Sequence, residues 1–295
     1  MTSSQRDPVL VIGATGRIGR LVVDDLLRTG VQVRALTRRP ELASLPAGVD
    51  VVAGDLTIPE SLDAPLNGAG AVFLLWTAAP TTAREVIARI AAHARRRRRV
   101  VYLSAPFRTP HPFFQQPNVM RDLHEELERA LAEAELATTI LRPGMFASNV
   151  LHWWAPQIRA GDTVRWPYAD VETAPIDERD VAAVAARVLT DDSYANADHV
   201  LTGPESLSHR AQLHAIGNAI GRPLVFEELS AEEFRRETDG VWPENLADML
   251  LSAWDAAQGQ PAFVTGAVRE ILGVPARTFH DWAADNAAAF SRIAR

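Results

Sequence analysis

Short apolar runs alternate with longer stretches of helical spacing along the first half of the chain. The first run, residues 8–12, is rich in β-branched side chains and is followed at once by glycines. Five further runs have the length and composition of strands, and they cover residues 31–36, 49–53, 71–76, 100–104 and 137–141. Helical stretches separate these runs, notably 81–95 and 118–135. The alternation predicts an α/β fold with a doubly wound parallel sheet of the Rossmann type.

The pattern changes after about residue 150. Aromatic residues cluster there, and strand-like runs become scarce. The elements expected beyond this point are helices over 178–190, 208–220 and most of 230–292, and strands at 199–202 and 224–227. We therefore expect two parts. Residues 1–150 form the sheet, and residues 151–295 form a smaller, mostly helical lobe that is interleaved with it.

A glycine-rich turn, Gly-Ala-Thr-Gly-Arg-Ile-Gly, stands between the first strand and the first helix. Its first glycine lets the chain turn, its second lets the backbone approach a pyrophosphate, and its third lets the helix pack close to the strand. The phosphates then meet free N–H groups and the positive end of the helix dipole. Strand, glycine turn and helix in this order open a dinucleotide-binding unit. The residues predicted to hold the dinucleotide here are Gly13, Thr15, Gly16, Arg17, Ile18 and Gly19.

Arg38 and Arg39 follow the second strand run. A fold that prefers NAD usually has an acidic residue at this place, where it holds the ribose 2′-hydroxyl. Two guanidinium groups instead suit a 2′-phosphate, which they bind through charge-assisted hydrogen bonds. The pair therefore predicts NADP(H) as the cofactor. The alternative is that both arginines are simply solvated at a strand end.

The ends of the other parallel strands are expected on the same edge of the sheet. Asp55 follows the third run, where its carboxylate would accept a hydrogen bond from the adenine amino group, with Leu56 beside the ring. The alternative for Asp55 is a turn or capping residue. The residues after the fourth and fifth runs, expected beside the ribose and nicotinamide, are Trp76, Thr77 and Ser104.

The composition narrows the chemistry. The 295 residues are 47 % hydrophobic and carry a net charge of −7, which argues against nucleic acid as a partner. No apolar stretch is long enough to cross a membrane, and the start does not read as a signal peptide, so a cytoplasmic location is expected. The chain has no cysteine, and all 30 basic residues are arginine. Thiolate and lysine chemistry are therefore excluded. The histidines show no spacing typical of metal ligands, so no metal is expected.

Several segments resemble the NmrA-like group of atypical short-chain dehydrogenase/reductases. They are the glycine turn 13–19, the Gly-Asp-Leu turn 54–56, the stretch 174–182, and His-Glu-Glu-Leu-Glu at 124–128 leading into Thr-Ile-Leu-Arg-Pro-Gly-Met-Phe-Ala-Ser-Asn at 139–149. The group includes quinone reductases, triphenylmethane-dye reductases, isoflavone and benzylic-ether reductases, and redox-sensing regulators. The resemblance implies that the residues lining the nicotinamide are Pro143, Gly144, Met145 and Phe146. It also implies that Asn149 supports the substrate site.

The chain departs from ordinary short-chain reductases at the proton donor. Those enzymes use a Tyr-x-x-x-Lys pair, whereas this chain has only Tyr102, Tyr168 and Tyr194 and no lysine. By the resemblance, His124 stands where lysine-type members carry their catalytic lysine, as in the quinone-reductase and dye-reductase branch. His124 then contacts the nicotinamide ribose, donates a proton, or serves as a structural residue. Ser104 matches the catalytic serine of the reductases, or is simply a small residue at a strand end.

The absence of the Tyr-x-x-x-Lys pair limits the class of substrate that the protein could reduce. Loss of general-acid help lowers a rate by about 10²–10⁴-fold, which an electron-poor acceptor tolerates and a simple ketone does not. Aromatic residues expected near the nicotinamide would stack on a flat substrate. The alternative is that they pack the smaller lobe onto the sheet. These residues are Phe107, Phe113, Phe114, Trp153, Trp154, Trp166 and Tyr168.

We expect the protein to be an NADPH-dependent oxidoreductase that acts on an activated aromatic or quinone-like molecule. Such an enzyme would belong to secondary metabolism. In that case residues 1–150 are the NADP-binding domain and residues 151–295 the substrate-binding lobe. The alternative is a non-catalytic NADP(H) sensor of the NmrA type. Whether the helices over 245–292 form a homodimer stays open.

Overall fold

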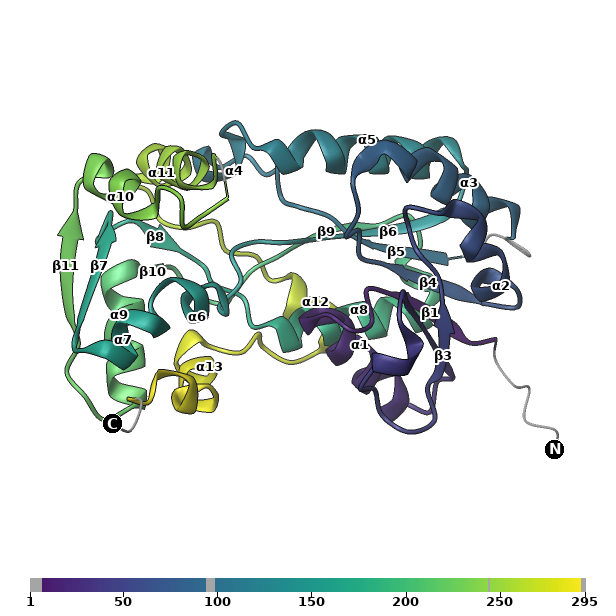
Figure 1. Ribbon diagram of the computed structural model, residues 1–295, viewed down its shortest axis with the longest axis horizontal. Coiled ribbons are helices and arrows are strands. Elements are labelled where there is room, and N and C mark those ends of the chain that lie inside the picture. Colours follow the sequence, from purple (N-terminus) through teal and green to yellow (C-terminus); the bar gives the residue numbers. More distant parts are fainter. Residues whose placement is uncertain (1–6, 94–98, 244, 293–295) are drawn as a thin grey trace. The chain divides into compact units, whose positions relative to one another are not determined.

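The strand runs of the first half of the chain pair into one sheet (Figure 1). The structure is a computed structural model that describes residues 7–93, 99–243 and 245–292. The strand order is β3-β2-β1-β4-β5-β6-β9, and every pair with a defined register is parallel. The strands are β1 (Val9–Ile12), β2 (Val33–Thr37), β3 (Asp50–Ala53), β4 (Ala71–Leu74), β5 (Arg99–Leu103), β6 (Ala137–Pro143) and β9 (Asp198–Leu201). This order confirms the predicted Rossmann-type sheet.

Helices cover both faces of the sheet. Helices α3 and α5 pack together on one face, and α1 and α8 pack together on the other (Figure 1). The helices are α1 (Arg17–Arg28), α2 (Asp63–Leu66), α3 (Ala83–Ala92), α5 (Val119–Glu133) and α8 (Glu178–Thr190), with short 3₁₀ turns η1 (Pro40–Leu42), η2 (Pro59–Leu62), η3 (Pro80–Thr82) and η4 (Asp192–Tyr194). Strands β1 and β4 are buried at every position, because helices on both faces exclude water from the central strands.

By its internal contacts the chain divides into two compact units, each made of separate stretches of sequence. The first unit comprises Met1–Ala105, Val119–Arg142 and Glu178–His199, and the second comprises Pro106–Asn118, Pro143–Asp177 and Val200–Arg295. The assignment of residues 1–150 to cofactor binding and 151–295 to substrate binding remains a prediction.

The second unit is built mainly of helices around two small sheets. Strand β11 (Val225–Leu229) pairs in parallel with β7 (Thr163–Pro167), and β10 (Leu207–Ser208) pairs antiparallel with β8 (Glu172–Thr173). The helices are α4 (Pro112–Gln115), α6 (Asn149–Trp153), α7 (Ala155–Ala160), α9 (His209–Ala219), α10 (Ala231–Thr238), α11 (Leu246–Ala257), α12 (Ala267–Leu272) and α13 (Phe279–Asp285), followed by the turn η5 (Ala287–Phe290).

The second unit has its own hydrophobic core. Three fully or almost fully buried indoles, Trp154, Trp166 and Trp254, lie at its centre, with ring centroids 5.6–6.1 Å apart where they contact. Burying an aromatic side chain stabilises a fold by about 1.5–3 kcal/mol or more, so this cluster is a main source of the unit's stability.

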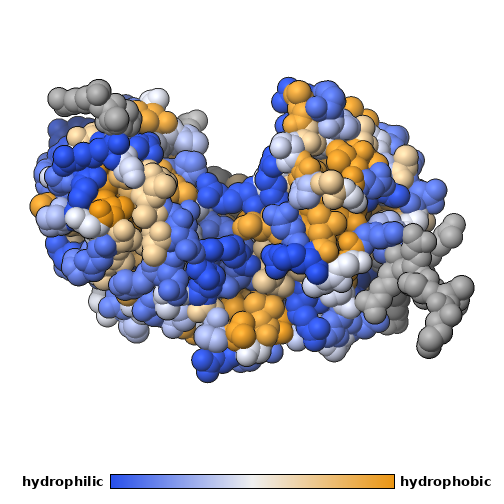
Figure 2. Space-filling model, turned by 90° about the horizontal axis from the view of Figure 1, so that it is seen from below, coloured by the Kyte–Doolittle hydropathy of each residue, from blue (hydrophilic) through white to orange (hydrophobic). Residues whose placement is uncertain are grey.

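On the surface shown in Figure 2, hydrophilic residues alternate with apolar patches of limited size. Within the part of the chain that the structure describes, no helix is both long and apolar enough to cross a membrane. Among the same residues, no group of three or more histidine, aspartate or glutamate side chains is arranged to hold a metal ion.

Candidate functional site

The glycine turn joins β1 to α1 through one tight hydrogen bond. The N–H of Gly16 donates to the carbonyl oxygen of Gly13 at 3.0 Å. Gly13 has a φ of +85°, a conformation that favours glycine over residues with a side chain. Gly16 is the N-cap of α1 and has no side chain to satisfy the free N–H groups of the first turn. Those N–H groups are therefore available to an anion, as the sequence predicts.

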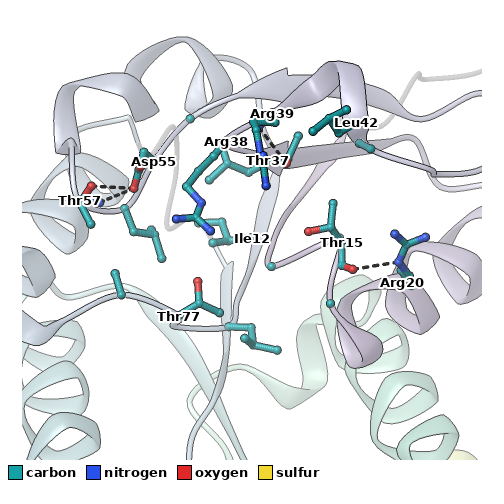
Figure 3. A pocket seen from close by; sticks show the side chains of 18 residues that line it. Ile12, Thr15, Arg20, Thr37, Arg38, Arg39, Leu42, Asp55, Thr57 and Thr77 are labelled. Carbon is teal, nitrogen blue, oxygen red and sulfur yellow. Dashed lines mark hydrogen bonds between the residues drawn. The ribbon is translucent and has the colours of Figure 1, made fainter.

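A cavity of about 400 Å³ opens beside this turn (Figure 3). We call it the strand-end cavity, because its walls come from the ends of β1, β2, β3 and β4. The predicted cofactor residues that line it are Gly13, Thr15, Gly16, Arg38, Arg39, Asp55, Leu56 and Thr77. Arg20, Leu36 and Leu42 also line it, although no sequence motif marks them as cofactor contacts. They follow from the fold, since α1 and the loop after β2 frame the same opening.

Arg38 and Arg39 are exposed at the rim of the strand-end cavity. In Figure 3 the side chain of Arg38 extends toward the middle of the cavity. Among the described residues, no carboxylate lies within ion-pair distance of either guanidinium. Arg20 is engaged differently, because its Nε donates to the carbonyl oxygen of Thr15 at 2.9 Å. The two arginines after β2 therefore keep their positive charge available for an anionic ligand.

Asp55 is held by its own turn. Its Oδ1 accepts hydrogen bonds from the backbone N–H of Thr57 at 2.9 Å and from the Thr57 hydroxyl at 2.8 Å. The Thr57 backbone N–H is the main cause of a lowered pKa for Asp55, and the charge of Arg38 adds to it. The turn role that was the alternative for Asp55 is thus present in the structure. Its contact with adenine remains a prediction.

Other predicted cofactor residues lie away from the cavity walls. Gly19 and Ile18 are buried in α1. Trp76 is buried with its Nε1 donating to the carbonyl oxygen of Ala78 at 2.6 Å. Trp76 therefore anchors the loop after β4, while its neighbour Thr77 faces the cavity. The expected strand 71–76 ends at Leu74, which frees both residues to form this loop.

Ser104 and His124 belong to a polar cluster within the first unit. Ser104 follows β5, is buried, and donates its hydroxyl hydrogen to Oε1 of Glu128 at 2.6 Å. Glu128 also accepts two hydrogen bonds from Arg142, at 2.7 and 2.9 Å. Arg142 in turn binds Asp198 at 2.7 and 2.8 Å. Ser104 is therefore tied into a buried ion-pair network.

Arg142 is the centre of this network, and its side chain is 1 % exposed. Burial alone would lower the pKa of the guanidinium, but the hydrogen bonds and charges of Glu128 and Asp198 outweigh burial and raise it. The network thus carries one fixed positive charge between two carboxylates. Glu128 and Arg142 belong to the segments 124–128 and 139–149, which resemble the NmrA-like group. Their ion pair, across 14 residues of sequence, was not predicted.

His124 is half-buried on α5, and its Nδ1 lies 2.5 Å from the hydroxyl oxygen of Tyr102 on β5. Burial is the main cause of a lowered pKa for His124. Tyr102 is fully buried, and burial raises the pKa of its phenol. At neutral pH both groups are therefore uncharged. In the sequence, Tyr102 stands out only as a tyrosine without a partner lysine.

The segment 143–149 lies in the second unit. The Gly144 N–H donates to Leu201 at 2.8 Å, and Met145 and Ala147 exchange backbone hydrogen bonds with Ile176 at 2.8 and 2.9 Å. Phe146 forms a bridge with the same residue. These backbone contacts hold the segment in place beside Ile176.

Gly144 and Met145 line a small apolar recess within the second unit. We call it the Phe113 recess; the aromatic and polar residues that line it with them include His111, Phe113, Phe114, Glu172, Thr202 and Phe263. Of the aromatic residues expected around a substrate, only Phe113 and Phe114 line this recess. Phe107 is buried elsewhere, with Arg108 stacked over its ring at 5.6 Å.

The tryptophans expected near the substrate are packed into the core of the second unit. Trp154 is 0 % and Trp166 2 % exposed, so neither presents a face to a ligand in this structure. Trp153 and Tyr168 are partly buried against the same core, and Trp153 stacks on Trp166 at 5.3 Å. The packing role that was the alternative for Trp154 and Trp166 is thus present in the structure, and a contact of either residue with a substrate remains a prediction. Asn149 opens α6.

The turn, the cavity and the sheet order together are those of a nicotinamide-dinucleotide protein. A family profile described as NAD(P)H-binding matches residues 13–192, which is more than half of the chain. The chain belongs to this NAD(P)H-binding family. Within it the segments described above place the chain in the NmrA-like branch of atypical short-chain dehydrogenase/reductases.

Two curated relatives match along their whole length. The chain is 38 % identical over 285 residues to the (4-alkanoyl-5-oxo-2,5-dihydrofuran-3-yl)methyl phosphate reductase of Streptomyces griseus, covering 96 % of this chain and 99 % of the relative. It is 33 % identical over 289 residues to the NAD(P)H azoreductase of Xenophilus azovorans, with the same coverage of 96 % and 99 %. The family member described here is accordingly an NAD(P)H-dependent oxidoreductase, as predicted.

Solved structures share the fold. The NADPH-dependent quinone oxidoreductase QOR2 of Escherichia coli aligns with a TM-score of 0.79 at 24 % identity, covering 94 % of this chain and 98 % of that chain. The triphenylmethane reductase of Citrobacter sp. aligns with a TM-score of 0.80 at 19 % identity, covering 95 % and 99 %. Both alignments extend over the two units and confirm the predicted fold class.

Proposed function

We propose that this oxidoreductase uses NADPH to reduce an activated, electron-poor acceptor of the aromatic or quinone-like class. The observation that carries the proposal is the uncharged pair formed by Tyr102 and His124 in a chain without lysine. Burial moves the pKa values of both groups away from neutrality. A proton donor works best when its pKa is near the working pH, so this pair favours acceptors that need little help from an acid.

The strand-end cavity supports NADPH as the reductant. The N–H groups in the first turn of α1 would hold the pyrophosphate, and Gly13 and Gly16 would let it approach the backbone closely. Arg38 and Arg39 would bind the 2′-phosphate, since their guanidinium groups are exposed at the cavity rim. When bound, NADPH supplies a hydride. The residues of the chain supply position, which in favourable cases accounts for about 7–11 kcal/mol of a reaction barrier.

The names of the relatives agree with this class of acceptor. One relative is an azoreductase, and another, 26 % identical over 92 % of this chain and 95 % of its own length, is quinone oxidoreductase 2 of Escherichia coli. The Streptomyces griseus relative reduces an acyl-substituted oxo-dihydrofuran phosphate by its name. Because that relative has the higher identity to the chain, an unsaturated acyl lactone phosphate is the second candidate substrate.

The test is NADPH oxidation followed by absorbance with a panel of acceptors. The panel contains a naphthoquinone, an azo dye, a cationic triphenylmethane dye, an acyl lactone phosphate and a simple ketone. We expect oxidation that requires both protein and an electron-poor acceptor, with NADH slower than NADPH and the ketone inert. Tight NADPH binding by fluorescence, without oxidation by any acceptor, would overturn the proposal and favour the nucleotide-sensor alternative.

A further inference from the structure

The contact between Tyr102 and His124 leaves only two hydrogen-bonding arrangements. The Tyr102 hydroxyl oxygen lies 2.5 Å from Nδ1 of His124, and the two ring centroids are 5.8 Å apart. Either the phenol donates to Nδ1, so that Nε2 carries the imidazole hydrogen, or Nδ1–H donates to the phenol oxygen. A neutral imidazole has one donor and one acceptor nitrogen, so the contact decides which nitrogen is which.

The neighbours of Tyr102 favour the first arrangement. Its hydroxyl hydrogen must go to an acceptor, because a buried donor without a partner is strongly disfavoured. Ser104 is the other polar group near the phenol. Its own hydrogen goes to Glu128, and its oxygen accepts a hydrogen bond from Arg142 at 3.3 Å. Ser104 therefore uses its hydrogen and one of its two oxygen lone pairs within the ion-pair network. The hydrogen bond that the Tyr102 hydroxyl makes is the one to His124 at 2.5 Å, so we assign the phenol hydrogen to Nδ1.

We propose that Tyr102 is a positioning residue that fixes His124 as the neutral tautomer with its hydrogen on Nε2. His124 then serves as an uncharged hydrogen-bond donor to an acceptor oxygen, either a ribose hydroxyl of the cofactor or an oxygen of the substrate. It does not serve as the proton donor. The part of this inference that concerns catalysis rests on the proposed function, and the tautomer itself does not.

Burial and two charged groups set the protonation state of the pair. Burial keeps His124 neutral and keeps Tyr102 protonated. Glu128, from the same helix, raises the pKa of His124, while Arg142, from β6, lowers it. Arg142 holds Glu128 in a close ion pair, so its positive charge offsets part of the effect of the carboxylate on the imidazole. Burial therefore remains the main cause of the neutral state.

Nitrogen-15 NMR of the histidine rings tests the tautomer without any substrate. His124 is assigned by the signals lost in His124→Gln. In the unaltered protein we expect an Nε2–H tautomer whose signals do not titrate until the pH is below the usual histidine range of about 6.5. In Tyr102→Phe we expect mixed tautomers, while the titration stays below the usual histidine range because burial, its main cause, is kept. Tyr194→Phe, which removes a hydroxyl in η4, is the control and should leave the His124 signals unchanged, although those of His199, whose ring lies 6.0 Å from that of Tyr194, can shift.

Kinetics with a confirmed acceptor test the role. His124→Gln keeps an N–H donor but cannot gain a proton, so its kcat should stay within about threefold of the unaltered enzyme, whereas His124→Leu should lose about tenfold or more. The kcat of the unaltered enzyme should be flat between pH 6.5 and 8, a range set by the usual histidine pKa of about 6.5.

Each result decides one question. An Nδ1–H tautomer in the unaltered protein, or a Tyr102→Phe spectrum identical to it, overturns the tautomer assignment even if the protein is a reductase. Equal losses in His124→Gln and His124→Leu, with a kcat that falls as His124 loses its proton, would make His124 the proton donor and overturn the proposed role. Absence of turnover with every acceptor contradicts the proposed function alone, because the NMR result stands without it.

Discussion

The carbonyl oxygen of Gly13 fills the space that a Cβ atom on Gly19 would need. The two residues belong to the turn and to the first helical turn after it, so α1 approaches the end of β1 more closely than any residue with a side chain allows. Gly16 is less restricted, because a Cβ there would lie 3.3 Å from the same oxygen. The three glycines of one motif therefore have different physical roles.

Gly19→Ala should disturb the turn itself. The clash is with backbone, which cannot rotate away, so α1 must shift and the protein should lose about 1–3 kcal/mol of unfolding free energy together with most of its NADPH affinity. Urea unfolding and a fluorescence titration with NADPH measure the two effects. Gly161→Ala is the matched control, since nothing lies within 4 Å of an added Cβ there and its φ is extended. Equal behaviour of the two variants would contradict the packing argument.

The paired variant Arg38→Ala, Arg39→Ala should change the cofactor preference. Charge-assisted hydrogen bonds to a phosphate contribute about 1.5–3 kcal/mol, so the KM for NADPH should rise by about 10- to 100-fold. The KM for NADH should change little, because NADH has no 2′-phosphate. Arg236→Ala, which removes an exposed arginine from α10 in the second unit, is the control. A parallel rise for both cofactors would show that the two arginines do not read the 2′-phosphate.

Removing one partner of the buried ion pair should destabilise the protein strongly. In Glu128→Gln, the guanidinium of Arg142 would lose a carboxylate that it contacts at 2.7 and 2.9 Å. Breaking a buried pair in this way typically reduces stability by about 3–5 kcal/mol. The control is Arg129→Gln on the same helix, because Arg129 is 57 % exposed in its pair with Glu126 and such a surface pair contributes about 0–1 kcal/mol. Similar urea midpoints for both variants would contradict the distinction.

Much of the fold could be predicted from sequence, because strand and helix periods differ and the glycine turn fixes the start of the sheet. The expected strand at 31–36 is found at Val33–Thr37, and the expected helix at 178–190 is α8. The cavity lining around Gly13, Arg38 and Asp55 followed from the rule that parallel strands end on one edge.

The burial of the tryptophans and the buried ion-pair network could not be predicted from sequence. For the tryptophans, the reason is that the same sequence pattern fits both a substrate pocket and a hydrophobic core. Trp154 and Trp166 are aromatic residues in loops and short elements, which fits a substrate pocket as well as a core, and only the packed structure shows them buried. The link from Ser104 through Glu128 to Arg142 joins a strand end, a helix and a second strand. No spacing along the chain indicates such a contact.

His209 provides the clearest pH dependence. It is 1 % exposed in the core of the second unit, with Nδ1 3.0 Å from the carbonyl oxygen of Tyr168, and its Nε2 has no hydrogen-bond partner among the described residues. Burial lowers the pKa of His209 to about 4, although the hydrogen bonds to Pro167 and Tyr168 oppose the shift. The unfolded chain, with a histidine pKa of about 6.5, binds a proton that the folded state excludes. Stability contributed by neutral His209 is therefore complete above about pH 6.5 and is lost as the pH falls toward 4.

We therefore expect the unfolding free energy to fall by about 1.6 kcal/mol between pH 6.5 and pH 5 through this group alone, with a slope that approaches about 1.4 kcal/mol per pH unit below pH 6. His209→Asn keeps a donor for the Tyr168 carbonyl but cannot titrate, so it should flatten this part of the pH profile even if it is less stable at pH 7. Urea unfolding at a series of pH values measures the slope for each protein. His214→Asn, an exposed histidine on the same helix α9, should keep the slope of the unaltered protein. If His209→Asn keeps that slope as well, the acid sensitivity arises elsewhere and His209 is not the group that couples stability to pH.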